Sequence, residues 1–183
     1  MPTFEEIYSS EAYAADYDAL VSAEDYQGNL LATLRQITPL AGNVVVEFGA
    51  GTGRLTRLLA PHVREIHAFD RSPQMLAIAR RRLESLPEMN WTLDVADNSS
   101  LPVGDQSADI AIEGWSFGHL TEFEAERWKD AIAAVMDEMR RVTRPDGAMV
   151  LFETMGTGAD SPAPPNDSLA ELYRMWEEDL KFS

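Results

Sequence analysis

Cysteine is absent from the 183 residues of this chain. Its absence excludes disulfides and every metal site built on thiolates. A protein without disulfides is compatible with a reducing compartment, and we expect it in the cytoplasm. The first residues, MPTFEE, are acidic and lack the apolar centre of a signal peptide, which agrees with that expectation.

Positive charge is scarce. Lys and Arg together number 15 against 31 Asp and Glu, which gives a formal net charge of −16. Such a field repels a phosphate backbone unless a local basic patch overcomes it, so we expect no nucleic-acid partner. The dense basic run Arg80–Arg82 falls late in a predicted helix, where cations favour the C-terminal end of the helix dipole.

Long apolar runs are also missing, so we expect no membrane span. The hydrophobic fraction of 45% is ordinary for a globular protein, and 183 residues suit one domain. We therefore expect a single domain over residues 1–183. It divides into an N-terminal helical cap over 1–40, a core over 41–155, and a loop and helix over 156–183.

Within the core, short apolar runs alternate with helical patterns. This alternation predicts a Rossmann-like three-layer α/β/α sandwich with a mainly parallel sheet covered on both faces. The expected strands are 44–48, 65–69, 91–93, 109–112 and 148–152, and a turn is expected at 145–147. The expected helices are 55–59, 72–86 and 122–142, with further helices within 4–37 and over 168–180.

The most informative stretch, EFGAGTG at 47–53, follows a strand and opens a helix. Glycines there allow a sharp turn and let a ligand lie close to the main chain. The helix that follows offers free N–H groups to an anionic group. A phosphate-binding P-loop is excluded, because Gly53 is followed by Arg54 and Leu55 rather than by Lys and Ser or Thr.

The dinucleotide motif G-x-G-x-x-G also fits poorly. Counted from Gly49, its third small residue falls on Arg54, which would obstruct close packing of helix on strand. Glu47, two residues before the first glycine, would repel a pyrophosphate and would suit a ligand with an ammonium and a sulfonium. Asp70 ends the second strand about 20 residues later, where a carboxylate reaches the hydroxyls of a ribose. Nicotinamide and adenosyl cofactors would both use Asp70, so this residue does not distinguish between the two cofactor classes.

Five segments in this order resemble the successive motifs of class I S-adenosylmethionine-dependent methyltransferases, in particular the small-molecule group. They are VVVEFGAGTG, HAFDRSPQML, VADNSSLP, ADIAIEGWSFGHL and MRRVTRPDGAMVLFE, and they cover about residues 40 to 155. The resemblance implies a sheet of order 3-2-1-4-5. It also implies S-adenosylmethionine as cofactor, S-adenosylhomocysteine as product, and in-line methyl transfer to a small-molecule acceptor.

The resemblance also implies roles for single residues. Glu47 would meet the amino group of the cofactor, Asp70 would hold the ribose hydroxyls, and Glu113 would lie beside the methionine moiety. The glycine turn, Gly49, Ala50, Gly51, Thr52 and Gly53, would carry the methionine part, and Arg71, Met75, Ala96, Asp97 and Asn98 would surround the adenine. Each has a plainer alternative, such as core packing for Met75, a loop turn for Asp97 or a solvent-facing position for Glu113.

Catalytic candidates follow the fourth strand, where ligands bind in open α/β sheets. His119 lies there, and a neutral imidazole can act as a base near pH 7. Packing at a helix start is the alternative for His119. Trp115 and Phe117 could line an aromatic wall or belong to the core. From the N-terminal helices, Tyr17 could close over the cofactor, with helix packing as its alternative.

One departure from the family pattern concerns the end of the sequence. Members usually continue after the fifth strand with a helix and an antiparallel strand pair, whereas one helix follows here, so that we expect a truncated or minimal version. The fifth strand would then be an open sheet edge, which predicts either a homodimer or instability of the chain. Two other functions stay open: a binding module that has lost catalysis, and a nicotinamide-dependent oxidoreductase.

Overall fold

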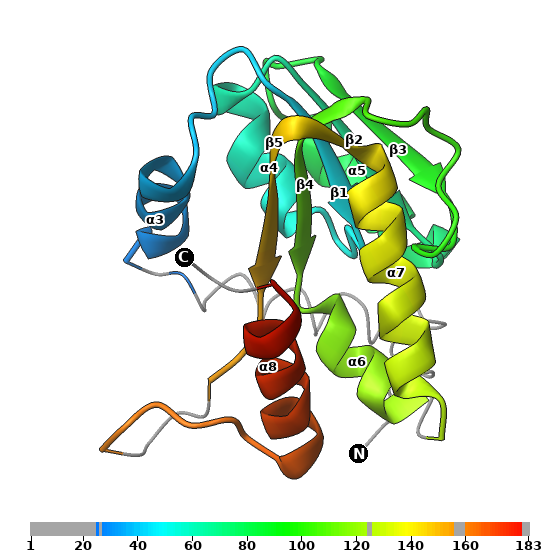
Figure 1. The fold of residues 1–183 in the computed structure, drawn as a ribbon. Helices are drawn as coiled ribbons and strands as arrows, with labels where there is room; N and C mark the ends of the chain where they lie inside the picture. The colour runs from blue at the N-terminus through cyan, green and yellow to red at the C-terminus, as the bar shows by residue number, and fades with distance from the viewer. Residues whose placement is uncertain (1–24, 26, 124–125, 156–159, 181–183) are drawn as a thin grey trace.

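A parallel sheet with helices on both faces forms the centre of the molecule (Figure 1). The computed structural model describes residues 25, 27–123, 126–155 and 160–180. Five strands stand in the order β3-β2-β1-β4-β5, and all four neighbouring pairs are parallel. The predicted fold class and strand order are thereby confirmed.

The elements follow the predicted alternation closely. The strands are β1 Val44–Phe48, β2 Glu65–Asp70, β3 Trp91–Val95, β4 Ala108–Gly114 and β5 Thr143–Phe152. The helices are α3 Asn29–Ile37, α4 Arg54–Leu59, the 3-10 turn η1 Ala60–His62, α5 Pro73–Leu83, α6 Ser116–Phe123, α7 Trp128–Val142 and α8 Asp167–Leu180. Most of the N-terminal segment predicted to be helical, including Tyr17, lies outside the described residues.

Two predicted elements need correction. The long helix expected over 122–142 begins only at Trp128, and a separate helix, α6, precedes it. Helix α6 starts where strand-end carboxylates from β4 and β5 accept its first N–H groups, a tertiary contact that local periodicity does not reveal. Strand β5 begins at Thr143 rather than Ala148, and the turn expected at 145–147 lies in an irregular part of the ladder.

Hydrophobic contacts hold the three layers together. All five residues of β1 are buried, as expected for a central strand covered on both faces. On one face Val46 and Phe48 join a cluster with α7 and α8, in which Trp176 of α8 takes part. On the other face Val45 packs with α3 and α4. The C-terminal helix therefore contributes to the main core.

The N-terminal cap of helix α5 fixes the position of Asp70, which ends the preceding strand β2. Ser72 is the N-cap, its side chain accepts a hydrogen bond from Met75 N at 3.3 Å, and Pro73 occupies the first helical position. Met75, Ile78 and the other predicted apolar positions are buried. The cap fixes the chain directly after β2, so that the Asp70 side chain has a defined orientation. In the described ranges, no helix is long and apolar enough to cross a membrane.

Gly53, the N-cap of α4, permits a close approach between α4 and α5. Its φ is +80°, and a Cβ there would lie 2.9 Å from Cβ of Ala79 in α5. We predict that Gly53→Ala destabilises the protein by about 2–5 kcal/mol, because a left-handed conformation costs about 1–2 kcal/mol and overpacking adds about 1–3 kcal/mol. Urea unfolding measures the change.

Gly42→Ala is the matched control for this substitution. Gly42 has a φ of +82° and no atom within 4 Å of an added Cβ, so this variant carries the conformational cost alone. Equal destabilisation by the two variants would contradict the packing argument.

Candidate functional site

The glycine turn leads from β1 into α4 in a backbone conformation that glycine favours. Gly49, Gly51 and Gly53 have φ values of +73°, +52° and +80°. A Cβ on Gly49 would lie 2.7 Å from Cβ of Ser116, at the start of α6. The turn therefore lies directly against α6, with main-chain groups in place of side chains on its surface.

Glu47 lies at the base of this turn and is buried, with 2% of its surface exposed. Its Oε2 accepts a hydrogen bond from the Thr56 hydroxyl at 2.6 Å. The pKa of Glu47 is raised from 4.5 to about 8: burial is the main cause, the Thr56 hydrogen bond opposes it, and the negative charge of Asp70 adds to it. A buried carboxyl in this state gains a great deal from a cation placed beside it.

Asp70 ends β2 next to the turn and is also buried, with 5% of its surface exposed. Its two oxygens accept hydrogen bonds from Gly51 N at 2.8 Å and Ser72 N at 2.7 Å. Burial raises the pKa of Asp70, and these two N–H groups and the charge of Arg71 oppose that shift. Because Asp70 bonds to the turn and acts electrostatically on Glu47, the two predicted carboxylates share one site.

The residues predicted around an adenine lie beside Asp70. Ala96 N donates to the main-chain oxygen of Asp70 at 3.2 Å. Asp97 is exposed and accepts hydrogen bonds from the Ser99 main chain at 2.8 Å and the Ser99 hydroxyl at 2.6 Å, so it does stabilise a turn. Met75 is fully buried.

Two polar side chains meet at the position where a Cβ of Gly49 would be. Asn98 Nδ2 is 3.4 Å from that position and Ser116 Oγ is 2.9 Å from it. Asn98 Oδ1 and Ser116 Oγ are both buried and have no hydrogen-bond partner among the described residues. Unpaired buried polar atoms are costly, so a ligand that bonds to these two atoms would be stabilised.

Glu113, at the end of β4, is fully buried rather than solvent-facing. Its Oε1 accepts hydrogen bonds from the N–H groups of Ser116 and Phe117, the latter at 3.0 Å, so it caps α6. Its Oε2 is buried and has no partner in the described part of the chain. Burial raises the pKa of Glu113 to about 8, and the charge of Glu153 adds to the shift.

The structure places one of the two predicted catalytic residues. Burial and the nearby charge of Arg71 lower the pKa of His119 to about 4, so its imidazole is neutral at pH 7 but a weak base. Arg71 also acts on Asp70 and Asp97, which brings His119 into the same neighbourhood. Tyr17 lies outside the described residues.

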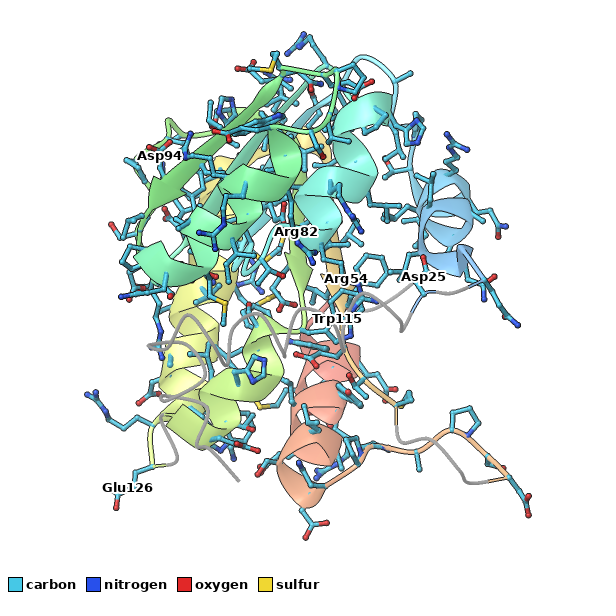
Figure 2. The ribbon with its side chains drawn as sticks, turned by 180° about the vertical axis from the view of Figure 1, so that it is seen from behind. Asp25, Arg54, Arg82, Asp94, Trp115 and Glu126 are labelled. Carbon is cyan, nitrogen blue, oxygen red and sulfur yellow. The ribbon has the colours of Figure 1, made fainter. Side chains whose placement is uncertain are left out.

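The sequence-based prediction did not include the contact between Arg54 and Trp115 or the carboxylate of Glu153. Trp115 has a φ of +63°, stacks on Phe152 at 5.7 Å, and lies under the guanidinium of Arg54, 4.0 Å from the ring centroid (Figure 2). Arg54 therefore packs on an aromatic ring beside the turn. Glu153, just after β5, accepts a hydrogen bond from Gly118 N at 2.6 Å. The strand-end position that singled out Glu47, Asp70 and Glu113 would also have found Glu153.

The chain belongs to a methyltransferase domain family, whose model matches residues 45–147. That range contains the glycine turn, Asp70, the loop with Asp97, and Glu113. The predicted family is thereby confirmed.

Among curated relatives, a malonyl-[acyl-carrier protein] O-methyltransferase of Halorhodospira halophila is 32% identical over 93% of this chain and 51% of its own length. A demethylmenaquinone methyltransferase of Clavibacter sepedonicus is 31% identical over 76% of this chain and 57% of its own length. The chain thus spans about half the length of the curated relatives it matches.

Solved structures share the fold. A putative S-adenosyl-L-methionine-dependent methyltransferase of Methanococcus maripaludis superposes with a TM-score of 0.65 over 99% of this chain and 77% of its own, at 17% identity. A SAM-dependent methyltransferase of Aquifex aeolicus gives 0.63 over 80% of this chain and 76% of its own, at 19% identity.

The buried carboxyls predict a pH-dependent stability. The pKa values of Glu47 and Glu113 rise from 4.5 to about 8 in the folded state, so between these pH values the folded protein binds more protons than the unfolded one. The contribution of these two carboxyls to stability is then fully present below about pH 4.5 and is lost as the pH rises through about 8. Glu47→Gln stays uncharged, and we expect it to gain at least about 1 kcal/mol relative to the parent protein between pH 5 and pH 8.

Urea unfolding at several pH values measures this difference. Glu84→Gln, a change at an exposed site after α5, is the control and should follow the parent protein. A Glu47→Gln curve parallel to that of the parent would refute the burial argument.

Proposed function

We propose that this protein binds S-adenosylmethionine at the glycine turn and transfers its methyl group to a small-molecule acceptor. The observation that carries the proposal is the pair of buried carboxylates, Glu47 and Asp70, linked through the turn by the Gly51 N–H bond. A pyrophosphate beside Glu47 would add negative charge to a site that already disfavours it. A ligand with an ammonium, a sulfonium and a ribose matches both carboxylates.

The residues of the site fit this cofactor. Ionised Glu47 can face the ammonium, which would return its pKa toward the ordinary range. Each oxygen of Asp70 accepts one N–H hydrogen bond and keeps a lone pair for a ribose hydroxyl. The unpartnered oxygens of Asn98 and Ser116 next to Gly49 offer further polar contacts.

The remaining predicted roles belong to the same proposal. The turn from Gly49 through Ala50, Gly51 and Thr52 to Gly53 carries the methionine part, and Glu113 keeps α6 in place beside it. Arg71, Met75, Ala96, Asp97 and Asn98 form the adenine side. Because Asp97 is engaged by Ser99, its contact with the adenine is the weakest of these assignments.

Bound S-adenosylmethionine would supply a methyl group on a positively charged sulfur with a good neutral leaving group. The protein then has mainly to hold the acceptor in line with that bond and to exclude water. His119, with its pKa near 4, serves better as a neutral hydrogen-bonding group than as a strong base. The helix start at Ser116 and the ring of Trp115 provide fixed walls next to the turn.

Two observations support a small-molecule methyl acceptor. The net charge of −16 disfavours a polyanion such as nucleic acid. The relatives named above are described as acting on a malonyl group carried by a protein and on demethylmenaquinone, which are small methyl acceptors. We also propose a cytoplasmic location, from the absence of cysteine, and pairing of two copies along the β5 edge of the sheet.

Calorimetric titration with S-adenosylmethionine and S-adenosylhomocysteine tests the cofactor assignment. We expect both to bind, and Asp70→Asn to weaken both at least about tenfold, because a hydrogen bond to a charged group contributes about 1.5–3 kcal/mol. Asp94→Asn is the matched control, an exposed carboxylate on β3 that lies away from Arg54 in Figure 2.

Circular dichroism on each variant shows whether it is folded. If Asp70→Asn does not fold, Glu47→Gln is the second variant in which we expect weaker cofactor binding. Absence of binding at about 1 mM ligand to the folded parent protein, or tighter binding of NADH, would overturn the proposal.

A further inference from the structure

Two carboxylates from neighbouring strands hold the start of helix α6. Glu113, at the end of β4, accepts hydrogen bonds from the N–H groups of Ser116 and Phe117. Glu153, just after β5, accepts the next N–H group, that of Gly118, at 2.6 Å. The first N–H groups of a helix have no partner within the helix, so they need acceptors from outside it. Both strand ends therefore determine where α6 begins.

The chain enters α6 through a backbone conformation that is unfavourable by itself. Trp115 lies between the last residue of β4 and the first residue of α6, and its φ is +63°. A residue with a side chain keeps this left-handed conformation only where the surrounding structure enforces it. The N–H of Trp115 bonds to the main-chain oxygen of Phe152 at 2.8 Å, and the N–H of Gly118 bonds to Glu153. Both bonds tie the start of α6 to the end of β5.

Ser116, the first residue of α6, brings this helix against the glycine turn. A Cβ on Gly49 would lie 2.7 Å from Ser116 Cβ and 3.4 Å from Asn98 Nδ2. Ser116 Oγ and Asn98 Oδ1 are the buried atoms that lack a hydrogen-bond partner within the described ranges. A ligand on the turn can use Ser116 only while α6 keeps it in this place. A shift of α6 away from β5 would therefore change the site at the end of β1, two strands from Glu153.

We propose that Glu153 is a positioning residue for the cofactor: by accepting the N–H of Gly118 it holds α6 against the glycine turn and so raises the affinity for S-adenosylmethionine and S-adenosylhomocysteine. The inference rests on the proposed methyltransferase function and adds to it a residue that acts through α6. Without this acceptor, α6 would lose part of its order and regain it only when the ligand binds. That ordering would then reduce the binding free energy.

The role requires an acceptor oxygen in the right place rather than a negative charge. Burial raises the pKa of Glu153, and its charge contributes to the raised pKa of Glu113, so the charge of Glu153 is itself disfavoured. A neutral side chain of equal length with an oxygen at the same position should hold α6 as well. Glutamine has that oxygen, whereas methionine has nearly the same length and only a weakly accepting sulfur.

The variants Glu153→Gln and Glu153→Met separate the acceptor oxygen from the packing of the side chain. S-adenosylhomocysteine is titrated calorimetrically into the full chain of each variant and of the parent protein. We expect Glu153→Met to weaken binding at least about fivefold and Glu153→Gln to stay within about twofold of the parent protein. If circular dichroism shows that Glu153→Met is unfolded, Glu153→Ala takes its place.

Asp109→Ala is the matched control, because Asp109 makes a similar bond at the opposite edge of the sheet. It lies at the start of β4, where its Oδ2 accepts the N–H of Val44 at 2.7 Å and its Oδ1 pairs with Arg144. Urea unfolding should show a loss of stability in Asp109→Ala, whereas S-adenosylhomocysteine should bind within about twofold of the parent affinity. An equal loss of affinity in Asp109→Ala and Glu153→Met would assign Glu153 a general structural role and overturn the proposal.

Hydrogen exchange of the ligand-free protein shows whether the effect passes through α6. A local loss in Glu153→Met would affect the N–H of Gly118 alone, whereas a displaced α6 also exposes the N–H groups of Ser116 and Phe117, which keep Glu113 as acceptor. We expect these two to exchange at least about threefold faster in Glu153→Met than in the parent protein or Glu153→Gln. Weaker ligand binding with unchanged exchange would mean that Glu153 contacts the ligand itself, which overturns the positioning role.

The titration of the parent protein distinguishes the two proposals. If the parent binds S-adenosylhomocysteine with an affinity that Glu153→Met leaves unchanged, the proposed function stands and the positioning role of Glu153 is wrong. If the folded parent does not bind S-adenosylhomocysteine at about 1 mM, the methyltransferase assignment and the effect of Glu153 on the cofactor are both wrong. The exchange rates then still show whether Glu153 holds α6 in place.

Discussion

The hydrogen bond from Gly51 N to Asp70 ties the glycine turn to the neighbouring strand, and the arrangement of the site depends on it. It orients the turn that follows β1 toward the end of β2 and keeps Asp70 within electrostatic reach of Glu47. Both carboxyls are buried, which disfavours their ionised forms. The site is therefore prepared for a ligand that brings positive charge and hydroxyl groups.

The parallel arrangement of the strands explains why several carboxylates lie close together in this molecule. Parallel strands end at one edge of a sheet, so carboxylates at or near the ends of β1, β2, β4 and β5 gather along it. Glu47 and Asp70 hold the turn, whereas Glu113 and Glu153 bind the first N–H groups of α6. One pair lies at the proposed cofactor site, and the other fixes the start of the short helix α6 beside it.

Much of the fold follows from local patterns in the sequence. The apolar run that forms β1 has its predicted limits, and the Ser72–Pro73 cap marks the start of α5, because both signals lie within a few residues. Helix α6 was missed because its start depends on Glu113 and Glu153, the latter 35 residues away from Gly118 in sequence. Likewise, only the folded chain shows that the guanidinium of Arg54 packs on Trp115.

We propose that Glu47 stays protonated near neutral pH until a cationic amino group binds beside it. Carbon-13 NMR of the Glu47 side-chain carboxyl, assigned with the Glu47→Gln variant, measures its titration directly. We expect a Glu47 pKa of about 8 in the ligand-free protein. When S-adenosylhomocysteine saturates the site, this pKa should fall by at least about one unit, or about 1.4 kcal/mol. An ordinary pKa without ligand, or a raised one that the ligand leaves unchanged, would contradict it.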